Sequence, residues 1–282
     1  MESLPTDCKA VINLAGNNIM DPTRRWNEEF RKELWDSRIG TTQLLASLIK
    51  NSHHKPEAFI TASAIGYYGS HTLEDCTEDS PPGDLTDFLV ELCLGWEKAA
   101  KLPKDLGVRQ VTIRIGLVLG RAGGMIRNLF WPFYLGGGGP MGTGSQYMSW
   151  IHHLDVVGIF EHALMNSATV TSGILNATSP YPCMNEEFAR NFAHALWRPS
   201  LVPFPEFALK LVFGAERAAI MTGGARVLPK RTLATGYEFR YPRIQTACRE
   251  LARFSWTPDE IEAWSLSDPK NIVNPKKSRS MY

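Results

Sequence analysis

The sequence predicts an α/β fold, in which helices cover both faces of a parallel sheet and a smaller, mainly helical region follows at the C-terminal end. Four short runs form the sheet: Lys9–Gly16, Ala58–Ser63, Val111–Leu119 and Gly173–Ala177. Each run is continuously apolar rather than alternating, which is typical of strands buried on both faces. Helical stretches separate the runs, and this alternation favours parallel pairing through right-handed crossovers.

Three helices are expected beside these strands. Asn27–Ile49 has apolar residues at helical spacing and is long enough for two helices or one bent helix. Thr86–Lys101 begins with two residues that can each cap a helix and ends with lysines, which suit the helix dipole. Asp155 can cap Val156–Met165 in the same way.

The pattern changes from about Pro180 onward. Helical spacing predicts Asn185–Trp197, Phe204–Ala219 and Ile244–Phe254, with an irregular or short-strand segment at Lys230–Pro242. The last residues combine lysines with Asn, Ser and Pro, which is typical of disorder. The expected divisions are a sheet domain over 1–180, a C-terminal helical domain over 181–264 and a disordered tail over 265–282.

Composition excludes several classes of partner. The 282 residues include 30 Lys or Arg and 29 Asp or Glu, so the net charge is +1 and gives no electrostatic reason to bind nucleic acid or a membrane. The longest apolar stretches are far shorter than the roughly 20 residues of a membrane-spanning helix. Five scattered cysteines without a CxxC spacing argue against disulfides and metal sites. We expect a cytoplasmic protein; if the chain is a shortened form, a targeting segment is missing with the rest of its start.

Three strand ends are rich in small residues. They are Asn13–Gly16, Thr61–Gly69 and Gly116–Gly120. Ligands of α/β proteins bind beyond the carboxyl ends of the strands, where small residues let the backbone come close. Any one of these glycines could serve only a tight turn, but three successive strand ends favour a ligand site.

A set of motifs resembles one known family. The motifs, over about residues 8–255, are Val11–Ile19, Ser63–Gly69, Trp96-Glu97, Arg114–Gly120, Trp150–Asp155 and Val227–Phe239. In this order they resemble the NAD(P)-dependent, sugar-epimerase-like branch of the extended short-chain dehydrogenase/reductases. The resemblance implies a Rossmann-type fold over residues 1–180, NADP as cofactor and oxidoreductase activity on a small molecule of unknown identity.

The resemblance also assigns cofactor contacts. The backbone of Leu14 and Ala15 would flank the adenine ribose, and Glu33, Arg38 and Val118 would line the same site. Arg38 could meet a phosphate group through two hydrogen bonds. The plain alternative is that Glu33 and Arg38 belong to an ordinary surface face of the helix.

One departure from the family concerns the start of the chain. The family begins with a strand, a Gly-rich loop and a helix that hold the cofactor's diphosphate. Here only nine residues precede Ala10, and no GxxGxxG lies near them. Gly116–Gly120 lies in a later strand and Gly136–Gly139 lies in a loop, so neither replaces the missing loop. We expect an N-terminally truncated sheet whose strand Val11–Ala15 is an exposed edge that promotes self-association.

A second departure concerns the catalytic Tyr-x-x-x-Lys. In no case is a tyrosine followed by lysine four positions later, and Leu89 and Cys93 stand at the positions of that pair. The lysine cation normally lowers the pKa of the phenol, which leucine and cysteine cannot do. The remaining catalytic candidates are Ser63 and Tyr67.

Each candidate has a structural alternative. Ser63 could satisfy a backbone group, and Tyr67 with Tyr68 could form a packed wall. His152 and His153 are better explained as turn residues than as metal ligands. The leading hypothesis is an NADP-dependent oxidoreductase, impaired in this shortened form. The alternative is a non-enzymatic member of the fold that senses a nucleotide or binds a protein.

Overall fold

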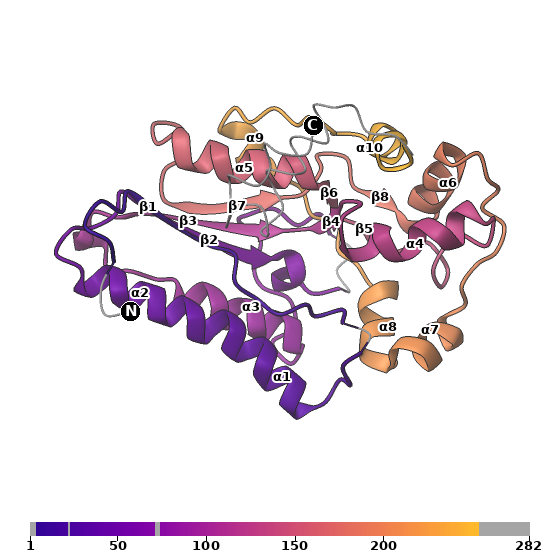
Figure 1. Ribbon diagram of the computed structural model, residues 1–282, viewed down its shortest axis with the longest axis horizontal. Helices are drawn as coiled ribbons and strands as arrows, with labels where there is room; N and C mark the ends of the chain where they lie inside the picture. Colours follow the sequence, from indigo (N-terminus) through magenta and orange to yellow (C-terminus); the bar gives the residue numbers. More distant parts are fainter. Residues whose placement is uncertain (1–3, 22, 71–73, 254–282) are drawn as a thin grey trace, which may run out of the picture.

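The computed structural model describes residues 4–21, 23–70 and 74–253. Its centre is a four-stranded parallel sheet in the order β1–β2–β3–β7 (Figure 1). The strands are β1 (Ala10–Asn13), β2 (Ala58–Ala64), β3 (Arg109–Ile115) and β7 (Gly173–Ala177). The predicted α/β class is therefore confirmed, and each of the four predicted runs overlaps one strand of this sheet.

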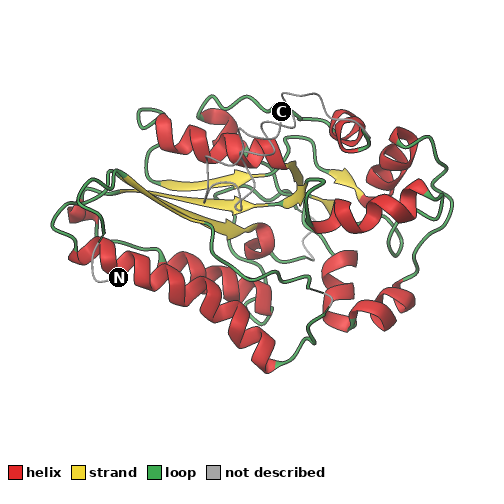
Figure 2. Cartoon of the chain, viewed as in Figure 1, coloured by secondary structure: helices red, strands yellow, loops and turns green. Residues whose placement is uncertain are grey.

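Helices cover both faces of this sheet (Figure 2). One face carries α1 (Glu28–Trp35), α2 (Thr41–Asn51) and α3 (Phe88–Ala99), and the other carries α5 (His153–Met165). The core between them includes fully buried isoleucines of β2, β3 and α5. This double coverage explains why the strands read as continuous apolar runs.

The first helical segment is one bent helix. A π-helical turn, Asp36–Gly40, joins α1 to α2 without a break. Asn27 caps α1 by accepting a hydrogen bond from the Phe30 N–H, at 2.9 Å. Asp87 caps α3 through the Leu89 N–H, at 2.8 Å, which confirms one of the two predicted caps.

The run Val111–Leu119 is not one strand. It divides at Gly116, where a Cβ atom would lie 2.4 Å from the Ser149 carbonyl oxygen. Beyond that close approach, β4 (Leu117–Leu119) leaves the main sheet and pairs with β6 (Trp150–His152). A further pair, β5 (Tyr147–Met148) with β8 (Cys183–Met184), is antiparallel.

The predicted cap at Asp155 is wrong. Helix α5 begins at His153 and is capped by His152, whose Nδ1 accepts from the Leu154 N–H while Nε2 lies 2.8 Å from Glu250 Oε2. Asp155 is buried in the first turn and accepts hydrogen bonds from the backbone N–H groups of residues 240 and 241. Its carboxylate therefore ties the C-terminal region to α5.

The region after Pro180 is mainly helical, as predicted. Its helices are α6 (Asn185–Ala195), α7 (Glu206–Phe213), α8 (Ala215–Thr222), α9 (Lys230–Ala234) and α10 (Ile244–Leu251). The helix predicted over Phe204–Ala219 is divided at Gly214, whose φ of 86° interrupts helical geometry. The segment predicted as irregular begins with α9.

A second apolar core joins α6 and α10 to α4 (Gly124–Tyr134), which belongs to the earlier part of the chain. The predicted domain limits, 1–180 and 181–264, therefore stay predictions. The predicted disordered tail at 265–282 lies outside the described residues. Within the described part of the chain, every helix is too short or too polar to cross a bilayer.

Strand β1 lies at the edge of the described sheet. It hydrogen-bonds to β2 on one side, and no described strand pairs with its other side. Two apolar residues at this edge are exposed, Ile12 by 43% and Leu14 by 61%. The self-association expected through Val11–Ala15 stays a prediction.

Candidate functional site

A row of polar residues crosses the sheet near its carboxyl edge. In the strand register, Ser63 of β2 lies beside Arg114 of β3, and Arg114 lies beside Asn176 of β7. All three are buried. Because parallel strands end at the same edge, the register alone brings these three side chains together.

Arg114 is held by Glu97 of α3. Its Nε donates to Glu97 Oε1 at 2.7 Å and its Nη2 donates to Oε2 at 2.9 Å, which makes the pair bidentate. The Ser63 hydroxyl donates to the same Oε1 at 2.9 Å. Burial alone would lower the pKa of Arg114, but the hydrogen bonds and charge of Glu97 outweigh burial and raise it. Arg114 is therefore a fixed cation.

Tyr68 completes this network. Its hydroxyl accepts from Arg114 Nη1 at 2.9 Å and donates to Asn176 Oδ1 at 2.8 Å. Burial raises the pKa of Tyr68 to about 12, although the charge and hydrogen bond of Arg114 act in the opposite direction. The buried Tyr68 is thus a neutral positioning group at physiological pH.

Tyr67 lies on the same cation. The Arg114 Cζ atom is 3.4 Å from the centroid of the Tyr67 ring, and the Tyr67 and Tyr68 rings meet edge to face at 5.2 Å. The structure thus brings together the two predicted catalytic candidates, Ser63 and Tyr67. Tyr67 and Tyr68 also form the packed aromatic wall that was considered as the alternative, and a cation lies beside the Tyr67 phenol.

Glu97 and Arg114 were not among the predicted site residues. The sequence does hold a signal for Arg114, because a lone charge between two isoleucines of an apolar strand must find a partner. Its partner Glu97 lies on a helix, and only the folded chain shows the pairing.

The positions of the absent Tyr-x-x-x-Lys face the same turn. Leu89 and Cys93 of α3 pack against Gly66, in the 3₁₀ turn that follows β2, and the Cys93 thiol donates to the Ala64 carbonyl oxygen at 3.6 Å. Burial, followed by the charge of Glu97, raises the pKa of Cys93 to about 12. The thiol is neutral, so the cation near the tyrosines comes from the sheet instead of from the helix.

The predicted cofactor contacts are partly brought together. Leu14 and Ala15 follow β1, and the adjoining backbone at Asn17 accepts from Arg38 Nη2 at 2.9 Å. Burial lowers the pKa of Arg38, whose guanidinium stacks over Trp96 with Cζ 5.2 Å from the ring centroid. Arg38 lies in the π-helical turn, and this turn directs it towards the loop after β1.

The other two predicted contacts lie elsewhere. Glu33 pairs with Arg24 at 2.5 Å, whereas Arg38 donates to the Leu34 and Asn17 carbonyl oxygens. The reason is that the loop before α1 brings Arg24 back alongside that helix. Val118 lies on β4 and thus in the small second sheet. The assignment of all five residues to a cofactor stays a prediction.

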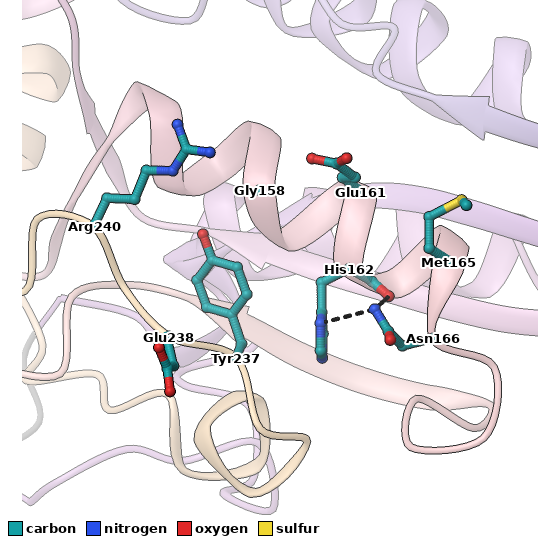
Figure 3. Close-up of a pocket in the computed structure, with 8 residues that line it drawn as sticks. All are labelled: Gly158, Glu161, His162, Met165, Asn166, Tyr237, Glu238 and Arg240. Carbon is teal, nitrogen blue, oxygen red and sulfur yellow. Dashed lines mark hydrogen bonds between the residues drawn. The ribbon is translucent and has the colours of Figure 1, made fainter.

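A shallow pocket of about 290 Å³ lies on the outer face of α5, towards residues 237–240 (Figure 3). Three of its polar side chains, those of His162, Asn166 and Tyr237, are hydrogen-bonded within the protein. His162 contacts Asn166 through Nδ1 and Thr235 through Nε2, each at 3.1 Å, and the Tyr237 hydroxyl lies 3.1 Å from Asp155 Oδ1. Glu97 lies on α3, which covers the opposite face of the sheet from α5. We therefore do not place the functional site in this pocket.

Two known protein-family models match this chain. The model of the "NAD dependent epimerase/dehydratase family" matches residues 2–177, and a domain of unknown function, DUF1731, matches residues 204–251. The chain belongs to the NAD dependent epimerase/dehydratase family. The family resemblance seen in the sequence motifs is therefore confirmed.

Individual relatives in this epimerase/dehydratase family agree. The human "epimerase family protein SDR39U1" is 44% identical over 244 residues, which are 86% of this chain and 82% of the human one. The Bacillus subtilis "epimerase family protein YfhF" is 35% identical, over 85% of this chain and 77% of its own. A crystal structure of human SDR39U1 isoform 2 with NADPH has a TM-score of 0.85 and covers 90% of this chain and 84% of that chain. The predicted Rossmann-like fold is thereby confirmed.

Proposed function

We propose that this chain binds NADP(H) along the carboxyl edge of its sheet and is an oxidoreductase acting on a small carbonyl or alcohol substrate. The main support for this proposal is the position of Tyr67, whose ring stacks on the fixed cation Arg114 and which is close in sequence to Ser63 near the end of its strand. The human relative whose structure contains NADPH supports the choice of cofactor.

The residues after β1 fit part of such a cofactor. Leu14 offers an exposed apolar side chain, and Arg38 uses two of its five N–H groups, towards Asn17 and Leu34. Gly16 lies so close to Arg38 that a Cβ atom there would be 3.1 Å from its Cζ. An apolar surface beside a guanidinium suits a ring system and a phosphate. These residues would therefore hold the part of the cofactor that carries a ring and a phosphate. When bound, NADPH supplies a hydride.

The chain's own residues would handle the proton. Tyr67 donates its hydroxyl proton to the substrate oxygen, and Arg114 balances the negative charge that remains on the ring. Because Ser63 donates its own proton to Glu97, its oxygen is left to accept a hydrogen bond from a substrate hydroxyl. Glu97 thus positions both Arg114 and Ser63.

A non-enzymatic nucleotide sensor is the second candidate. It is favoured by the neutral Cys93 and by Leu89 at the positions that active relatives use for proton transfer. A sensor would bind the nucleotide at the same edge of the sheet but transfer no hydride.

One experiment separates these functions. The full chain is titrated with NADPH by calorimetry, and NADPH oxidation is then followed with a panel of aldehydes, ketones and nucleotide sugars. Saturable binding with turnover of one substrate class supports the oxidoreductase. Binding without turnover across the panel supports the sensor, and the absence of binding contradicts both.

A further inference from the structure

Arg217 of α8 is a buried cation with unused hydrogen-bond donors. The residue is only 3% exposed, and its Nε and Nη2 atoms have no hydrogen-bond partner among the described residues. Within the part of the chain that the structure describes, its guanidinium makes one hydrogen bond, a long one of 3.5 Å from Nη1 to the Phe213 carbonyl oxygen. Buried polar groups are nearly always hydrogen-bonded, and an unpaired buried charge is costly. This arrangement therefore calls for an acceptor.

A third unused donor lies in the same place. The indole Nε1 of Trp26 is also buried and has no partner among the residues that the structure describes, and the Arg217 guanidinium lies 5.5 Å from the Trp26 ring. The ring of Phe30 is 5.4 Å from the same guanidinium. Figure 1 shows α8 beside the loop between β1 and α1, which carries Trp26. Two distant segments thus place three unused donors in one small region with aromatic walls.

Neither Asp21 nor Glu33 forms an ion pair with Arg217. Glu33 is occupied by Arg24, which lies against Phe30 with Cζ 5.5 Å from the ring. Asp21 uses its Oδ1 to accept from the Thr23 N–H at 2.9 Å and hydroxyl at 2.7 Å. These hydrogen bonds chiefly lower the pKa of Asp21, with smaller contributions from the charges of Arg24 and Arg217. Within the described residues, Arg217 makes no ion pair.

The unused atoms match one chemistry. The Nε and Nη2 of a guanidinium form a planar fork that pairs with two oxygens of a carboxylate or a phosphate. The indole N–H of Trp26, whose ring lies 5.5 Å from the guanidinium, can only donate, so it suits a further oxygen. The low polarity of the aromatic walls strengthens such charge-assisted hydrogen bonds.

We propose that Arg217 and the Trp26 indole form a binding site for an oxyanion, the carboxylate or phosphate group of a small molecule. The site shares no residue with the group around Ser63, Tyr67 and Arg114. It therefore stands whether or not the chain transfers a hydride. The competing explanation is an internal ion pair, in which the loop rearranges and Asp21 becomes the acceptor.

The test uses the full chain with inorganic phosphate and with malonate, each against sodium chloride at equal ionic strength. Unfolding temperature and tryptophan fluorescence are followed as the anion is titrated. We expect a saturable rise in unfolding temperature with at least one anion. Arg217→Lys keeps the charge but removes the fork, and should weaken the apparent affinity at least tenfold. Trp26→Phe keeps the ring and removes one donor, and should weaken it about threefold or more.

Arg24→Lys is the matched control, because Arg24 lies on the same Phe30 ring but is already paired with Glu33. It should leave the anion affinity within twofold. A response to phosphate alone or to malonate alone supports the site and identifies its class of ligand. If neither anion exceeds chloride in the wild-type chain, the proposal is wrong. It is equally wrong if Asp21→Asn destabilises the chain as much as Arg217→Lys and no anion restores either variant.

Discussion

Arg114 and Glu97 face each other in a bidentate ion pair between the sheet and α3, at 2.7 and 2.9 Å. Arg114 is 1% exposed in its side chain and Glu97 is 13% exposed. A pair so deeply buried contributes through geometry more than through net stability, because desolvation offsets much of the attraction. Its position explains how a strand that is otherwise apolar can hold a cation beside two tyrosines.

Glu97→Gln should therefore destabilise the fold strongly. The substitution keeps the size of the side chain but leaves the Arg114 guanidinium buried without a counter-charge, which costs about 3 kcal/mol. Urea unfolding followed by circular dichroism measures the loss. The matched control is Lys210→Gln, which breaks the exposed pair with Glu206 and should change stability by less than about 0.5 kcal/mol. Equal effects of the two variants would contradict the importance of burial.

Cys93 should make the fold sensitive to alkali. Its pKa is raised by burial from the ordinary 9.0 to about 12, so the folded state holds the proton more tightly than the unfolded state. The resulting stability is present below pH 9 and is lost as pH rises from 9 towards 12. Urea midpoints between pH 8 and 11 should fall less steeply for Cys93→Ala than for the wild type. Cys8→Ala, at a partly exposed thiol, should leave the slope unchanged, and parallel curves for all three proteins would rule the effect out.

Much of the fold could be predicted because its rules are local. Continuous apolar runs identified β1, β2 and β7, and the two possible caps, Thr86 and Asp87, indicated where α3 starts. The division at Gly116 could not be predicted, since it depends on the approach of the Ser149 carbonyl group from a distant segment. The same holds for Asp155, whose partners lie some eighty residues further along the chain.

The candidate site was predicted only in part for the same reason. Ser63 and Tyr67 follow a strand and belong to a recognisable motif, so the sequence was enough to select them. The charge between them depends on Glu97 meeting Arg114 across two elements, which no local pattern encodes. The unused donors of Arg217 and Trp26 are still harder to predict, because they are recognised only by the lack of hydrogen-bond partners among the described residues of the folded chain.

The edge strand β1 should promote self-association. Its outer side pairs with no described strand and exposes Ile12, and such edges template pairing with other chains. We expect size-exclusion chromatography with light scattering to show dimers or larger species in rising proportion with concentration. Ile12→Lys should lower that proportion severalfold, because a charge at an edge opposes pairing.

Val157→Lys is the control for this prediction, since Val157 is an exposed apolar residue on α5, away from the sheet edge. It should leave the distribution of species unchanged. A clean monomer of the wild type with a cooperative melt above about 60 °C, high for a mesophilic domain, would show that β1 is adequately protected.

Tyr67→Phe should separate catalysis from structure. The ring that stacks on Arg114 is retained, so the fold should be unchanged and the NADPH affinity should stay within about twofold of the wild type. The hydroxyl that would supply the proton is lost, and general acid catalysis contributes about 10²–10⁴-fold, so kcat should fall by that factor. Tyr181→Phe removes an exposed hydroxyl outside the site and should leave kcat unchanged. If Tyr67→Phe retains full turnover on a substrate that the wild type reduces, another group donates the proton and the role given to Tyr67 is wrong.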